Sequence, residues 1–169
     1  RYCTTGLCDI DGALPLAKVL WLKRNKPEIY NKTDKFLLLE DYLIFRLTGR
    51  CVSERSLQSS TGWYDIVRNQ MYADALELCA LDQEKFPEVL PCGSIVGTVL
   101  PERAKELRLS EKTVVVTGAM DQIASAIGAG NIRQGIITET TGTALVVGAT
   151  VATPQFDLQT PVTVYKHYN

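Results

Sequence analysis

The sequence predicts an α/β fold in which a mixed sheet is flanked by helices, and three observations support this prediction. Apolar residues recur at helical spacing in two segments, 14–26 and 40–47. An apolar strand at Val114–Val116 runs into an alanine- and glycine-rich helix at 120–129. The β-branched runs after Gly135 have no long helices between them, which is typical of antiparallel strands.

The composition is that of a globular protein, and it excludes several classes of partner. Of the 169 residues, 46% are hydrophobic and 22% are charged, so the chain can bury a core. The net charge of -1 provides no general attraction for nucleic acid or anionic lipid. No apolar run reaches the roughly 18 residues of a membrane span. From the charge and the missing span together, we expect neither a nucleic-acid nor a membrane partner.

The cysteines indicate a reducing environment. Their number is odd, and no two of them form a Cys-x-x-Cys pair, which argues against a structural zinc site. Reduced thiols in a cytoplasmic enzyme are therefore expected. The cysteines are Cys3, Cys8, Cys51, Cys79 and Cys92.

The first third of the chain is expected to be mainly helical. Pro27 should end the helix at 14–26, because proline cannot continue a helix. The short apolar run at 36–38 is interpreted as a strand. The helix at 40–47 should end at Gly49, which is placed as the residue after a helix C-cap.

The middle of the chain alternates polar segments with helices. Residues 50–65 are rich in hydroxyl groups, and a turn is expected at 59–62. A helix is expected at 71–81, followed by a loop at 87–93 because of its prolines and glycine. Pro101 suits the first turn of a helix that runs to about Arg108.

The last third is expected to contain most of the strands. Val114–Val116 is interpreted as a buried strand of the parallel type. Three antiparallel strands are expected at 136–140, 144–151 and 161–165. The change near 128–131 from a helix rich in Ala and Gly to β-branched runs predicts a domain boundary.

We therefore expect two parts, residues 1–130 and residues 131–169. The chain opens on Arg1 without a starting Met and closes on a strand-like run, so we expect it to be a fragment of a longer protein.

Asp121 is the first candidate for chemistry. It follows a glycine turn, Gly118-Ala119, at the start of a helix, where the helix dipole stabilises a carboxylate. An ionised carboxylate close to a hydroxyl group can act as a base, and the neighbouring Gln122 can hydrogen-bond a polyol. The alternative is that Asp121 only caps the helix, as Asp often does.

The second candidate is the turn Thr140-Thr141-Gly142-Thr143. It offers hydroxyl groups and main-chain N–H groups, which bind phosphate where they converge. The alternative is a simple turn between two strands. A Walker-type loop is excluded because no Gly-Lys-Ser or Gly-Lys-Thr occurs in the sequence.

Two other features of the sequence bear on its function. Residues 114–119 look like the opening of a nucleotide-binding strand–turn–helix, which keeps a nucleotide-binding oxidoreductase as an alternative function. The glycines at 128–135 do not fit the dinucleotide fingerprint. His167 is the only histidine, and no catalytic triad can be assembled around it.

The order of the motifs resembles the FGGY carbohydrate kinases, the group that includes xylulokinase and glycerol kinase. Six pieces match in order, and together they cover nearly the whole chain. They are residues 4–7 with 18–22, Glu40–Gly49, Ser53–Asp65, Leu90–Gly97, Gly118–Gln122 and Gly142-Thr143.

The resemblance implies part of an actin-like ATPase fold of the ribonuclease H type. Residues 1–130 would form the later part of the sugar-binding N-terminal domain, and residues 131–169 the first strands of the ATP-binding C-terminal domain. Asp121 would be the catalytic base and Gln122 a sugar contact, while Gly142 and Thr143 would face the phosphates of ATP. ATP and Mg²⁺ are the implied cofactors, and the family commonly forms homodimers.

The resemblance also implies the function: ATP-dependent phosphorylation of a hydroxyl group on a small sugar or polyol. A xylulose-like ketose is the first choice because of the loop at 11–15, with gluconate, ribulose, fuculose, rhamnulose and glycerol left open. A catalytically inactive kinase-like module is a further alternative.

The sequence departs from the family pattern in two ways. Ser53-Glu54 replaces a common Thr-Asp, and Gln58 replaces Ala, at positions interpreted as structural. The family's first phosphate loop and its later adenine-binding glycine pair do not occur in these residues, so the stretch alone is expected to be inactive.

Overall fold

The fold is α/β, as predicted, with small sheets surrounded by helices. The computed structural model describes residues 1–143 and 145–168. In these residues the strands form four two-stranded sheets, one parallel and three antiparallel. No helix in the described part of the chain is long and apolar enough to cross a membrane.

The first part of the chain is helical, as expected. Pro27 ends one helix and also begins the next, because its ring suits the first helical position. The predicted strand at 36–38 is wrong, since this segment belongs to no strand and Phe36 is tied to Lys85 by a single main-chain hydrogen bond of 2.7 Å. The helices are α1 (Tyr2–Thr5), α2 (Pro15–Asn25), α3 (Pro27–Lys32) and α4 (Leu39–Thr48).

The hydroxyl-rich segment after Gly49 contains more regular structure than its composition suggests. Gly49 itself ends α4 with a left-handed φ of 75°, as predicted. The strand β1 (Val52–Glu54) leads directly into α5 (Arg55–Gln58) and pairs in parallel with β4 (Glu88–Leu90). The sequence did not predict β1 because two of its three residues are polar. All three side chains are buried, and the two polar ones accept hydrogen bonds.

The segment of the sequence that connects β1 to β4 contains a hairpin and a short helix. The strands β2 (Tyr64–Asp65) and β3 (Gln70–Met71) are antiparallel, and the predicted helix at 71–81 is limited to α6 (Ala73–Leu78). A 3₁₀ turn, η1 (Gln83–Lys85), follows.

The strand at Val114–Val116 corrects two expectations. It exists as β6, but it pairs antiparallel with β5 (Ile95–Thr98) and not in parallel. Val114 is 50% exposed and Val116 is 49% exposed, so the strand is also not buried. An apolar run alone does not specify the direction of its partner. The helix between these strands is α7 (Pro101–Leu107), as predicted.

The last third contains one helix and one hairpin. The helix α8 (Asp121–Gly128) is followed by the antiparallel strands β7 (Ile137–Thr141) and β8 (Leu145–Ala149), as expected. Ala144, the first residue of the second predicted strand, lies outside the described residues.

The third predicted strand, at 161–165, is not formed. This segment instead lies against the start of the chain. The main-chain N–H of Val164 donates to the carbonyl of Gly6 at 2.8 Å, and the Tyr2 hydroxyl donates to the carbonyl of Val162 at 2.7 Å. One isolated main-chain bond to Gly6 does not make a ladder.

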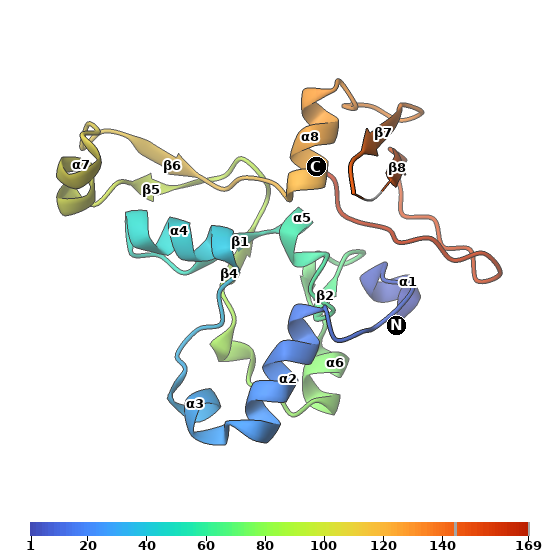
Figure 1. Ribbon diagram of the computed structural model, residues 1–169, viewed down its shortest axis with the longest axis horizontal. Helices are drawn as coiled ribbons and strands as arrows, with labels where there is room; N and C mark the ends of the chain where they lie inside the picture. The colour runs from blue at the N-terminus through green and yellow to red at the C-terminus, as the bar shows by residue number, and fades with distance from the viewer. Residues whose placement is uncertain (144, 169) are drawn as a thin grey trace.

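Two hydrophobic clusters hold these elements together. The larger one lies among α2, α3, α6 and the β2–β3 hairpin, in the lower half of Figure 1. Its buried members are Leu16, Val19, Tyr30, Trp63, Tyr64, Ile66, Leu76, Leu81 and Phe86. The smaller cluster joins α4 to β1 and β5 through Ile44, Val52 and Val96.

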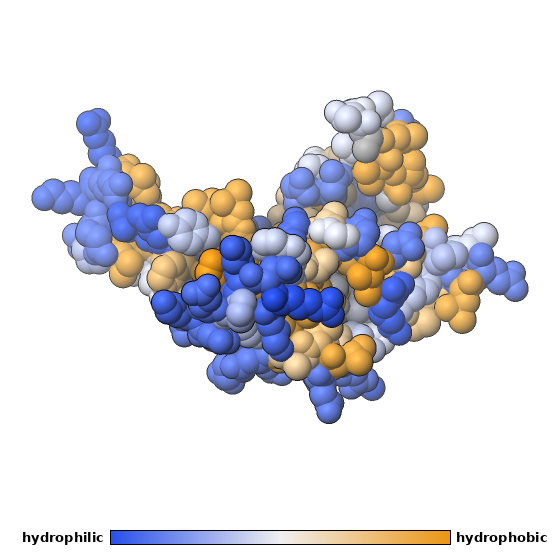
Figure 2. Space-filling model, turned by 60° about the horizontal axis from the view of Figure 1, so that its bottom comes forward, coloured by the Kyte–Doolittle hydropathy of each residue, from blue (hydrophilic) through white to orange (hydrophobic). Residues whose placement is uncertain are grey.

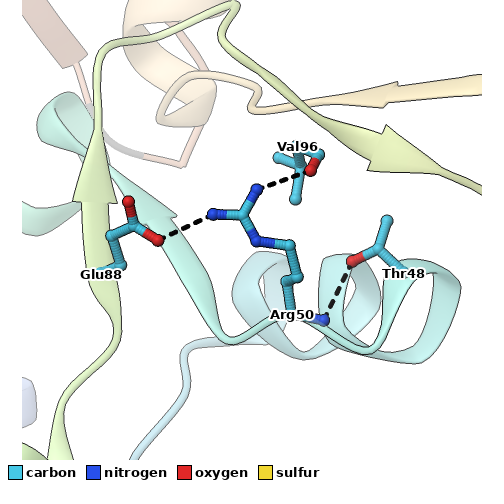
Figure 3. Close-up of polar contacts among 4 residues, drawn as sticks. All are labelled: Thr48, Arg50, Glu88 and Val96. Carbon is cyan, nitrogen blue, oxygen red and sulfur yellow. Dashed lines mark hydrogen bonds and ion pairs between the residues drawn. The ribbon is translucent and has the colours of Figure 1, made fainter.

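Arg50 connects three elements beside the smaller cluster (Figure 3). Its guanidinium donates to the carbonyl of Val96 on β5 at 2.7 Å and pairs with Glu88 on β4 at 2.8 Å. Its main-chain N–H donates to the Thr48 hydroxyl at the end of α4. The β5–β6 hairpin, which leads to α8, is thereby attached to the rest of the fold.

Two parts project from this centre (Figure 1): the β5–β6 hairpin with α7, and α8 with the β7–β8 hairpin. Hydrophobic residues are exposed on both, and Figure 2 shows them as orange areas on the two projections. Examples are Ile95, Val114, Ile137, Leu145 and Val147. The helix α5 lies at the centre, below the first turn of α8.

Candidate functional site

Asp121 is the first residue of α8. The N-cap position is occupied by Met120, so Asp121 is not the N-cap residue that the structural alternative supposed. Its Oδ1 accepts the main-chain N–H of Gln122 at 2.7 Å, one of the free N–H groups of the first helical turn. The side chain is exposed, and within the described residues its Oδ2 accepts no hydrogen bond. This oxygen is therefore available to an incoming group.

The turn before Asp121 is anchored by Thr117. The Thr117 hydroxyl donates to the carbonyl of Pro91 at 2.8 Å and accepts the main-chain N–H of Ser94 at 2.9 Å. The main chain of Thr117 bonds to Ser94 and Gly93 in addition. Thr117 is 1% exposed, so water does not compete for these bonds.

Gly118 lies against a carboxylate from α4. Its main-chain N–H donates to Oε1 of Glu40 at 3.0 Å. A Cβ atom at position 118 would lie 2.8 Å from that oxygen, so a larger residue would force the Glu40 carboxylate to move. Burial raises the pKa of Glu40, and the negative charge of Glu54 raises it further, while the bond from Gly118 lowers it.

Met120, directly before Asp121, is attached to a buried polar group. Its main-chain N–H donates to Oγ of Ser56 at 2.9 Å, and the Ser56 hydroxyl donates to Oε1 of Glu54 at 2.8 Å. The Cys92 thiol donates to Oε2 of Glu54 at 2.7 Å. Burial raises the pKa of Cys92 to about 11, and Glu54 adds to the shift, so the thiol remains protonated at neutral pH.

The motif comparison treated Ser53, Glu54 and Gln58 as structural positions, and the structure places all three inside, each 0% exposed. The Gln58 side chain donates to Ser53 and accepts the indole N–H of Trp63, both at 2.8 Å. The link from Glu54 through Ser56 to Met120 was missed. Its only sequence signal is a carboxylate two residues before a serine, which is too common to indicate a contact 64 residues away.

The other site candidates, Gly142 and Thr143, lie in the turn between β7 and β8 and are exposed. Within the described residues, no hydrogen bond joins them to Asp121 or Gln122. The turn presents uncharged hydroxyl and main-chain donors, which fit a phosphate group. Glu139 accepts the Thr141 hydroxyl at 3.1 Å beside it.

Candidate metal ligands do not cluster in the described residues. No group of three His, Cys, Asp or Glu side chains in that part of the chain could hold a metal ion. Mg²⁺ in phosphoryl transfer needs no such group, because it is held by one or two carboxylates together with substrate phosphates. The five cysteines are free, as expected. Burial lowers the pKa of His167, which packs edge-on against Tyr168.

Comparisons with known proteins place these features in a family. Residues 2–128 match the description "FGGY family of carbohydrate kinases, N-terminal domain". The chain is 36% identical over 115 residues to the xylulose kinase of Escherichia coli strain K12, covering 68% of the chain and 24% of that relative. It is 28% identical over 156 residues to the gluconokinase of Bacillus subtilis strain 168, covering 92% of the chain and 30% of that relative.

A solved structure gives the same result. The ligand-bound xylulose kinase from Lactobacillus acidophilus superposes with a TM-score of 0.87 at 26% identity, over 94% of this chain and 32% of that one. The solved kinases have the actin-like ATPase fold, which confirms the fold that the motifs implied. The chain spans between 24% and 32% of the length of these relatives.

Proposed function

Because the chain belongs to the FGGY family of carbohydrate kinases, we propose that the protein phosphorylates a hydroxyl group of a small sugar with ATP. The observation that carries this proposal is the carboxylate of Asp121, which is exposed and accepts one hydrogen bond. It directly follows a turn that is held by hydrogen bonds at Thr117, Gly118 and Met120. A general base needs an oxygen that is free to accept the proton, and its position has to be held within hydrogen-bond reach of the substrate.

In the proposed reaction, Asp121 takes the proton of the sugar hydroxyl through its free oxygen. The hydroxyl oxygen forms a bond to the γ-phosphorus of ATP, and the bond from that phosphorus to the β,γ-bridging oxygen breaks to release ADP. Positioning and charge stabilisation supply most of the catalysis in such transfers. Gln122, which follows Asp121 in the exposed first turn of α8, is proposed to hydrogen-bond the sugar.

The phosphates of ATP are proposed to lie at Gly142 and Thr143, whose exposed donors match them. Mg²⁺ would neutralise phosphate charge there. We propose that residues 1–130 belong to the sugar-binding domain and residues 131–169 begin the ATP-binding domain. The support is the end of the family match at residue 128 and the hairpin that follows Asn131. Closure of the two domains would then bring the base and the phosphates together.

A xylulose-like ketose is the proposed substrate, and gluconate is the second choice. The support is that the similar proteins named above are a xylulose kinase and a gluconokinase. A cytoplasmic location and a homodimer are proposed on the family resemblance alone. The oxidoreductase alternative has no support from the comparisons, and we do not retain it. These 169 residues by themselves are proposed to lack turnover.

The test is a coupled assay of ADP release with the full-length protein. The panel contains D-xylulose, L-xylulose and D-ribulose as ketoses, gluconate as an aldonate, and glycerol as a polyol. We expect turnover with one ketose well above the rate without sugar. Binding of ATP without turnover of any panel member would contradict the proposed reaction and favour a catalytically inactive kinase-like module.

A further inference from the structure

The main chain beside Asp121 is connected to two buried side chains. The N–H of Met120 donates to Oγ of Ser56 at 2.9 Å, and the Ser56 hydroxyl donates to Oε1 of Glu54 at 2.8 Å. Ser56 and Glu54 are both 0% exposed. Because water has no access, nothing replaces either bond when it is lost.

The direction of these bonds is fixed. A serine hydroxyl has one hydrogen to donate, and here it is used by Glu54, a charged acceptor that forms stronger bonds than a neutral one. A lone pair of Ser56 therefore remains directed at Met120. Glu54 is itself held in place, because its other oxygen accepts the main-chain N–H of Ser56 at 2.5 Å and the Cys92 thiol at 2.7 Å.

The connection reaches Asp121 from the paired strands at the centre of the fold. Glu54 ends β1, which pairs in parallel with β4, and it also caps α5. Met120 is the N-cap residue of α8, so the residue that follows it is Asp121. A shift of the Met120 N–H would move the first residue of α8 with it.

We propose that Glu54 and Ser56 are positioning residues for phosphoryl transfer, and that they hold Asp121 in the orientation in which it meets the sugar hydroxyl. This inference rests on the proposed role of Asp121 as the base. Misplacement of a reacting group by 1 Å can lower a rate about 100-fold, so the loss of one tether is expected to be visible in kcat.

The first experiment compares Ser56→Ala with Ser60→Ala in the full-length protein. Ser60 is the matched control because its hydroxyl bonds to the Leu57 carbonyl at 2.7 Å and has no hydrogen bond to the turn before α8 in the described residues. With the panel sugar that is turned over, we expect Ser56→Ala to lower kcat about tenfold. The KM for ATP should stay within about twofold, and Ser60→Ala should keep the kcat of the unmodified protein.

A double variant separates positioning from general stability. If Ser56 acts through Asp121, then Ser56→Ala should cause no further loss of kcat when Asp121 is already replaced by Asn. An effect on folding would lower kcat in both backgrounds. Deuterium uptake at the Met120 amide gives a readout without activity, and we expect faster uptake in Ser56→Ala than in Ser60→Ala.

The outcomes are distinguishable. An Asp121→Asn variant with normal kcat would overturn the proposed base and the reaction built on it. An inactive Asp121→Asn variant together with normal kcat in Ser56→Ala would overturn the positioning inference alone, as would unchanged uptake at Met120. If Ser56→Ala does not fold, Glu54→Gln replaces it, because Gln keeps the size of the side chain but removes the charge and replaces one of the two accepting oxygens by an NH2 group, which cannot accept. Normal kcat in a folded Glu54→Gln variant would equally overturn the inference.

Discussion

The main-chain N–H of Gly118 donates a hydrogen bond to Oε1 of Glu40 at 3.0 Å, across 78 positions of sequence. It joins the turn before Asp121 to the first turn of α4. The approach is close enough that a Cβ atom at position 118 would lie 2.8 Å from the same oxygen. A side chain at position 118 would therefore displace the Glu40 carboxylate from this position.

Gly118→Ala is expected to fold but to lose activity. The Glu40 side chain can swing away from the new methyl group, but the N–H of Gly118 then loses its partner. We expect a loss of about 1 kcal/mol in the free energy of unfolding, together with a fall in kcat of several-fold. Urea unfolding and the coupled assay measure the two effects.

Gly97→Ala is the matched control for this prediction. Gly97 lies on β5, in the hairpin beside the same turn, and a Cβ atom there would meet nothing within 4 Å. Its stability and kcat should be unchanged. Unchanged kcat in Gly118→Ala as well would show that the Glu40 contact does not position the turn.

Gln58→Ala is expected to be strongly destabilising for a substitution of one polar side chain. It removes the acceptor of the Trp63 indole N–H and the donor to the Ser53 oxygen, both of which are buried. A buried group without a partner costs about 1–3 kcal/mol. The midpoint of urea unfolding should fall accordingly, whereas the exposed Gln83→Ala control should not change it. Equal midpoints in the two variants would contradict the proposed role of Gln58.

Asp41 should make the stability dependent on pH. Burial raises its pKa from 3.8 to about 6, with smaller contributions from Glu40 and Glu54, while bonds from Ser53 and Leu38 oppose the shift. Between these values the folded state keeps a proton that the unfolded chain has lost. The stabilising contribution is therefore complete below pH 3.8 and disappears as the pH rises through about 6.

The measurement is the free energy of unfolding at several pH values in this window. Asp41→Asn should flatten the decline by up to about 3 kcal/mol, and the exposed Asp9→Asn control should not. Asn keeps an oxygen for the main-chain N–H of Leu38, which Asp41 binds at 2.9 Å. An unchanged decline in Asp41→Asn would assign the pH dependence to other groups.

The sequence was sufficient for the elements whose signal is local. Helical spacing and terminal residues predicted α2, α4 and α7, and the left-handed Gly49 ends α4 where expected. The hairpin after Gly135 followed from β-branched residues. These features depend on residues a few positions apart, which a single sequence displays.

Features that depend on distant partners could not be predicted. The strand β1 is polar in two of its three residues. It forms because its main chain pairs with β4 and Gln58 donates a hydrogen bond to its Ser53 side chain. The direction of β6 depends on β5, which the apolar run at Val114–Val116 does not encode. In the candidate site, Asp121 is predicted from its turn and helix and its role stays a proposal, whereas the bond between Met120 and Ser56 spans 64 positions and has no local pattern.

The proposed role of Asp121 as the base of a sugar kinase is tested by one comparison. The coupled assay is run on full-length Asp121→Asn and on Asp74→Asn, an exposed acid in the first turn of α6 that serves as the matched control. We expect kcat to fall about a thousandfold or more in Asp121→Asn, with ATP binding retained and Asp74→Asn fully active. Turnover of Asp121→Asn at the rate of the control would show that Asp121 is not the base.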